Sequence, residues 1–93
     1  MTKTTQPPAT TASDVREILL AIADELAEGP YYRTITEADR LTLILNEVAL
    51  LHGAGLPALN LDRAVRQAAP SIEWELTRGE YALILRRAAG GAQ

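Results

Sequence analysis

Residues 36–53, with the sequence TEADRLTLILNEVALLHG, decide the fold of this chain. Thr36 followed by Asp39 resembles a capping box, with aspartate where glutamate is usual, and Gly53 is typical of a helix end. The stretch therefore predicts a helix that ends at His52. Its main apolar face consists of aliphatic residues at helical spacing, namely Leu41, Ile44, Leu45, Val48 and Leu51.

The same helix carries a second apolar stripe. Leu43 and Leu50, seven residues apart, project from nearly the opposite side of the predicted helix. One neighbouring helix cannot cover both stripes. The stretch is therefore either the central helix of the fold or an interface helix, and a fourth helix or a connector that covers the two leucines within a monomer is an equally good explanation.

An amphipathic helix precedes this stretch. Ser13 can cap its N-terminus, and Gly29 and Pro30 end it, because glycine adopts the left-handed cap conformation and proline has no amide to donate. Residues 31–35 then form a connector or a short strand. The apolar residues of this first helix share one face, and they are Val15, Ile18, Leu19, Ile22, Ala23 and Leu26.

A third, shorter helix is predicted at residues 61–69. A loop over residues 52–57 leads to Asn60, whose side chain can cap the helix, and Pro70 ends it. The inner face is formed by Leu61, Ala64, Val65 and Ala68. The residues that point outward together are Arg63, Arg66 and Gln67.

The C-terminal segment has two interpretations. Residues 72–76 alternate apolar and acidic side chains, which predicts a half-buried strand or an extended connector, and we expect Trp74 to fill the core or its edge. Thr77 with Glu80 repeats the capping-box pattern, although the flanking residues do not match well enough to indicate a repeat. A helical apolar face follows, formed by Tyr81, Ile84, Leu85, Ala88 and Ala89.

The preferred fold class is therefore all-α, a small bundle of three to four helices. In the alternative, residues 77–80 form a tight turn and residues 81–85 form a second strand. The fold would then be a winged helix-turn-helix with a C-terminal hairpin.

Composition bounds the domain organisation. The 93-residue chain has no cysteine, so it can form neither disulfides nor thiolate metal sites. Residues 1–12 carry too little apolar surface to offset the entropy of ordering them, so we predict a flexible polar tail followed by a single helical domain over residues 13–90. Because apolar runs are far shorter than the ~20 residues of a membrane span and no signal-peptide pattern is present, we expect a cytoplasmic location without membrane contact.

No sequence pattern predicts catalysis, a metal site or a cofactor. His52 is the only histidine, and no ligand set at metal-binding spacing accompanies it, so it is better explained by its favourable position at a helix C-terminus. Acidic pairs such as Asp24 with Glu28 are better explained as solvated charges than as a catalytic acid and base. We therefore expect a protein that is not an enzyme.

Two functions from different classes remain. The preferred hypothesis is an acidic, non-enzymatic helical module, an adaptor, inhibitor or self-associating protein, that binds a copy of itself or another protein chain. The leucines expected at that interface are Leu20, Leu43 and Leu50. This hypothesis accounts for the apolar stripe that lies opposite the main face.

The alternative function is a DNA-binding winged helix-turn-helix regulator. Its nucleic-acid contacts would be Arg63, Arg66 and Gln67 on the recognition helix, with Arg78 at the tip of the wing. A net charge of −3 and a single lysine weigh against it, because phosphate contacts supply much of the affinity for DNA.

Overall fold

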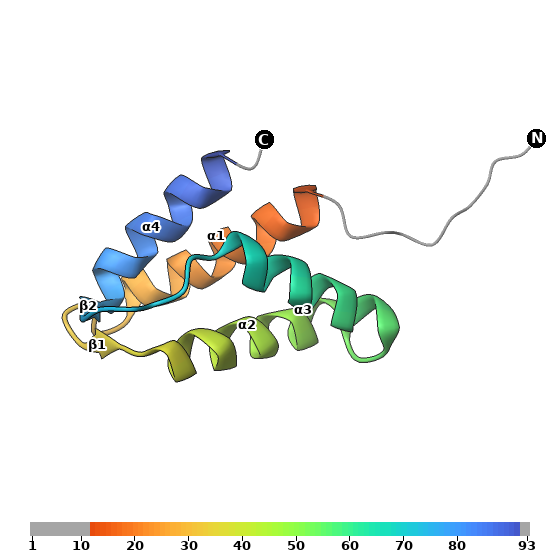
Figure 1. Cartoon of the computed structure of the whole chain (residues 1–93), viewed down its shortest axis with the longest axis horizontal. Coiled ribbons are helices and arrows are strands. Elements are labelled where there is room, and N and C mark those ends of the chain that lie inside the picture. Colours follow the sequence, from red (N-terminus) through yellow and green to blue (C-terminus); the bar gives the residue numbers. More distant parts are fainter. Residues whose placement is uncertain (1–11, 92–93) are drawn as a thin grey trace, which may run out of the picture.

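A computed structural model describes residues 12–91, and this part of the chain contains four helices and two very short strands (Figure 1). In chain order they are α1 (Ala12–Glu28), β1 (Thr34–Ile35), α2 (Glu37–His52), α3 (Leu56–Ala68), β2 (Leu76–Thr77) and α4 (Arg78–Gly91). The predicted all-α bundle is confirmed. The tail predicted at residues 1–12 lies outside the described residues except for Ala12, which begins α1.

Both capping boxes are present, and each starts a helix. At the start of α2, the Asp39 amide donates to Thr36 Oγ1 over 3.1 Å, and the Thr36 amide donates to Asp39 Oδ2 over 2.9 Å. Thr77 and Glu80 make the same two bonds at the start of α4, over 3.1 and 2.9 Å. Each box satisfies amides that have no partner within the helix.

The winged alternative is wrong for a local reason. Residues 81–85, the second strand of the expected hairpin, lie inside α4, because the Thr77–Glu80 box starts a helix rather than a turn. Arg78 is accordingly the first residue of α4 and not the tip of a wing.

The two strands pair antiparallel, with Thr34 opposite Thr77 and Ile35 opposite Leu76. The chain thus contains two helix–strand–helix units, α1–β1–α2 and α3–β2–α4, whose strands pair with each other. Beyond the strands, the first amides of α4 continue this pairing: Arg78 N–H donates to the Arg33 carbonyl and Gly79 N–H to that of Tyr31.

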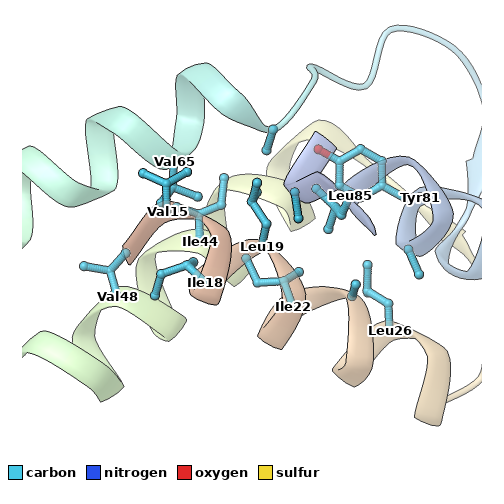
Figure 2. Close-up of a cluster of buried hydrophobic side chains, with 14 of the residues drawn as sticks. Val15, Ile18, Leu19, Ile22, Leu26, Ile44, Val48, Val65, Tyr81 and Leu85 are labelled. Atoms are coloured by element: carbon cyan, nitrogen blue, oxygen red, sulfur yellow. The ribbon is translucent and has the colours of Figure 1, made fainter. Parts of the chain in front are cut away.

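The core forms around α1, whose six predicted inward residues are all buried. Helix α1 packs most extensively against α4, and α2 packs most extensively against α3. Figure 2 shows Ile44 and Val48 of α2, Val65 of α3, and Tyr81 and Leu85 of α4 converging on the side chains of α1. Each such aliphatic side chain stabilises the fold by about 1.5–3 kcal/mol when fully buried.

Helix α3 begins earlier than the sequence predicts. It starts at Leu56 with Pro57 in its first turn, where the missing proline amide costs nothing. Asn60 is an exposed residue within the helix and not its cap. The N-cap is Gly55, whose φ of 109° is open to glycine and strained for other residues.

The predicted main face of α2 is only partly correct. Ile44 and Val48 are buried, but Leu45 is 53% and Leu51 45% exposed. In the view of Figure 1, the turn between α2 and α3 extends past the start of α1, and Leu51 lies in the last turn of α2, next to that turn.

The segment before β2 also differs from its prediction. Only Leu76 and Thr77 are in a strand, and Trp74 is 64% exposed instead of filling the core. The Ile72 amide donates to the Glu37 carboxylate, so its hydrogen bond goes to a side chain of α2 and not to the backbone of a neighbouring strand.

Candidate interaction surface

Exposed leucines cluster where α2 and α3 meet. Nine large apolar side chains are exposed among the described residues, and five of them are leucines within a stretch of fifteen residues. We call these five the leucine end, and they are Leu45, Leu50, Leu51, Leu56 and Leu59. A concentration of exposed apolar side chains of this kind is typical of a binding surface.

Two hollows flank α2 at the leucine end. The α2–α3 hollow, of about 280 Å³, is lined by Leu45 and Leu59 together with the glycines of the turn. Asp62 also lines it but is 8% exposed: its Oδ2 accepts from Arg66 Nε over 2.9 Å, while Oδ1 is buried with no hydrogen-bond partner in the described chain. This hollow therefore offers a mainly apolar lining.

The α1–α2 hollow lies on the other side of α2 and has a volume of about 470 Å³. Its lining residues are Glu25 of α1 and Leu43, Asn46, Glu47, Ala49 and Leu50 of α2. Partial burial raises the pKa of Glu47, and the nearby charge of Glu25 raises it further. The hollow thus combines two leucines with two carboxylates that repel each other.

The structure brings together two of the three leucines predicted at the interface. Leu43 and Leu50 both line the α1–α2 hollow, and Leu50 is 78% exposed. Leu43 also packs against the core, so only part of its side chain is free. Leu20 is partly buried against the core and lines neither hollow, so it does not belong to the exposed surface.

The residues predicted to contact DNA are divided between two sites. Arg63, Arg66 and Gln67 are all exposed on α3, as predicted. Arg78 instead lines a polar hollow with Arg33 and other residues of the region around β1 and α2, and no residue of α3 lines it. The recognition surface expected from the sequence is therefore not assembled.

Sequence reasoning missed Arg40, which is only 4% exposed. Its guanidinium donates to the Arg66 carbonyl over 2.7 Å, to the Ala69 carbonyl over 2.9 Å and to Glu37 Oε2 over 2.7 Å. The side chain thereby caps the C-terminal end of α3 from the first turn of α2. The sequence signal that could have placed Arg40 inside is its helical spacing from Ile44 and Val48, since all three lie on the buried face of α2.

Tyr81 adds a second polar contact to the same region. Its hydroxyl donates to the Pro70 carbonyl over 2.6 Å, directly after α3. Burial raises the pKa of Tyr81, and the positive charge of Arg40 opposes part of this rise. Together, Arg40 and Tyr81 hold the end of α3 against α2 and α4.

The described residues offer little else for chemistry. Among residues 12–91, no three His, Asp or Glu side chains are grouped so that they could hold a metal ion. Within the same range, no helix has the length and apolar character needed to cross a membrane. In comparisons with known proteins, no family model matched the chain, and neither a curated protein nor a solved structure matched it.

Proposed function

We propose that this chain is a non-enzymatic protein-interaction module that binds another protein chain, or a copy of itself, through the leucine end. The single observation that carries the proposal is the concentration of five exposed leucines where α2 meets α3. Two hollows beside these leucines supply concave contact surface. An adaptor or an inhibitor needs such a surface and no catalytic groups.

The exposed area is sufficient for binding of moderate strength. Fully burying a leucine contributes about 1.5–3 kcal/mol, so side chains that are roughly half to three-quarters exposed contribute about 1–2 kcal/mol each. Five of them give roughly 5–10 kcal/mol, to which the partner's own apolar surface adds. The loss of translational and rotational freedom opposes association by about 4–15 kcal/mol. The two contributions are of similar size, so the affinity depends on the apolar surface that the partner adds.

A cytoplasmic location is part of the proposal. A chain without cysteine gains nothing from an oxidising compartment. The net charge of −3 favours solubility in a module that exposes leucines before it meets its partner.

The test compares the wild-type chain with a variant in which Leu45, Leu50, Leu56 and Leu59 are replaced by serine. All four side chains are more than half exposed, so the variant is expected to keep its helices, as circular dichroism will show. Light scattering across a concentration range first reports whether wild-type copies associate and whether the variant does not.

A random-peptide library is then selected on the immobilised wild-type chain, with the variant used for counter-selection. The proposal predicts enriched peptides that bind the wild type and lose at least tenfold in affinity on the variant. If no association of copies is seen and no peptide distinguishes the two chains, the proposal is wrong.

A further inference from the structure

We propose that the α1–α2 hollow receives a basic amphipathic segment of another protein, with a lysine or arginine between Glu25 and Glu47 and an aliphatic side chain against Leu43 and Leu50. The inference rests on the proposed function and specifies the chemistry of the partner. It assigns the charged part of the contact to this hollow and the remaining apolar part to the leucine end.

Charge is the first reason. Glu25 and Glu47 are the two charged residues that line the hollow, and both are acidic. In the described part of the chain neither forms a salt bridge, whereas Asp24, next to Glu25 in sequence, is paired with Arg86 over 3.0 Å. A cation placed between the two carboxylates attracts both and offsets their mutual repulsion.

Shape is the second reason. The hollow is open to solvent and has a volume of about 470 Å³, so one or two side chains of a partner fit into it. Leu43 supplies an apolar wall that continues into the core, and the exposed Leu50 forms the rim. The methylene stem of a lysine or arginine packs well on such leucines while its charged end reaches the carboxylates.

The same charges disfavour a second copy of this chain as the occupant. In a two-fold dimer centred on the hollow, Glu25 and Glu47 of one copy would lie close to Glu25 and Glu47 of the other, and the four like charges would repel. The exposed Arg63 lies on α3, outside the hollow, and pairing it with the hollow of another copy would join two different surfaces. A two-fold dimer makes that contact only if Arg63 and the hollow belong to one continuous patch, and no residue of α3 lines the hollow.

The α2–α3 hollow does not share this selectivity. Its one acidic residue, Asp62, is already paired with Arg66 and is almost completely buried. A partner's basic residue would meet one carboxylate there instead of two, and Arg66 already lies beside that carboxylate, so the two hollows are expected to differ in their response to the partner's charge.

The experiment measures binding of a fluorescent 14-residue peptide that has leucine and lysine at helical spacing, by anisotropy at low and at physiological salt. The test variant is Glu25→Gln with Glu47→Gln. The matched control is Glu73→Gln with Glu75→Gln, which changes the net charge equally at two exposed carboxylates between α3 and β2. A second peptide carries glutamate in place of every lysine.

We expect the wild type and the control to bind the lysine peptide within twofold of each other, and the test variant to bind at least tenfold more weakly. Binding to the wild type should weaken as salt rises. Equal weakening in both variants, equal binding of the glutamate peptide, or no binding of the lysine peptide by the wild type would each overturn the inference.

The failure of this inference can be distinguished from failure of the proposed function. If the serine variant of the leucine end loses the lysine peptide while the Glu25 and Glu47 variant retains it, the leucine end binds without charge selection. The proposed function then stands and the inference does not. If peptides selected on the wild-type chain bind the serine variant equally well, the proposed function itself fails.

Discussion

Replacing Arg40 by alanine is expected to destabilise the fold more than any change at an exposed charged residue. The guanidinium donates three hydrogen bonds, two of them to carbonyls at the end of α3 and one to Glu37. The Ala69 carbonyl bond is buried, and water cannot simply replace the lost donor there. The variant leaves these acceptors without a partner and also leaves a cavity beside α2.

The size of the loss follows from these contacts. Breaking a buried charged contact by removing one partner costs about 3–5 kcal/mol. Arg40 Nε has no partner in the described structure, which lowers the net contribution of the side chain, so we expect about 3–4 kcal/mol. A domain of this size has a free energy of unfolding of roughly 4–12 kcal/mol, so the variant should lose between about a quarter and nearly all of its stability.

Urea unfolding followed by circular dichroism measures this loss. Arg87→Ala is the control, because Arg87 is exposed on α4, and its effect should stay within about 0.5 kcal/mol. Arg40→Met keeps most of the side-chain volume without the donors, so it separates the hydrogen bonds from packing. A loss below about 1 kcal/mol for alanine, or full recovery with methionine, would refute the role assigned to the hydrogen bonds.

Two further predictions concern the capping boxes and the acidic pair. Thr36→Ala and Thr77→Ala should each lower the free energy of unfolding, measured in urea, by about 1 kcal/mol. Thr42→Ala, at an exposed position within α2, is the control. Equal effects at all three positions would contradict the role of Thr36 and Thr77 as helix caps. Because the pKa of Glu47 is raised in the folded state, the stability linked to it is present below the ordinary pKa of glutamate and is lost as pH rises through the folded value. Glu47→Gln should therefore stabilise the chain at pH 7 but not near pH 3, and a gain of equal size at both pH values would contradict this linkage.

Most of the helical fold could be predicted from local signals. The spacing of apolar residues in α1 identified its buried face, because a helix that crosses the centre of a small bundle buries one continuous stripe. The two threonine boxes identified the starts of α2 and α4 through side-chain chemistry within four residues. Local signals of this kind do not depend on the rest of the fold.

Features set by the ends of neighbouring helices could not be predicted. Leu45 and Leu51 have the spacing of core residues, yet both are exposed, and Leu51 lies in the last turn of α2, beside the turn that extends past the start of α1. Arg40 has the charged side chain typical of a surface residue, yet it is buried because it binds the carbonyls at the end of α3. In both cases the deciding partner is distant in sequence.

The candidate site was predicted in part for the same reason. The stripe of Leu43 and Leu50 was recognised from their seven-residue spacing, and both line one hollow. Glu25 could not be assigned to that hollow from the sequence, because it comes from α1 and meets α2 only in the folded chain. The charge of the site is therefore a property of the fold and not of one helix.

The most direct test of the leucine end is to locate a bound partner on the folded chain. A peptide selected on the wild type is titrated into the ¹⁵N-labelled protein, and the backbone amide shifts are mapped by NMR. The account predicts that the largest shifts at saturation fall in residues 43–59 and near Glu25. Shifts confined to the exposed face of α4, with residues 43–59 unchanged, would contradict it.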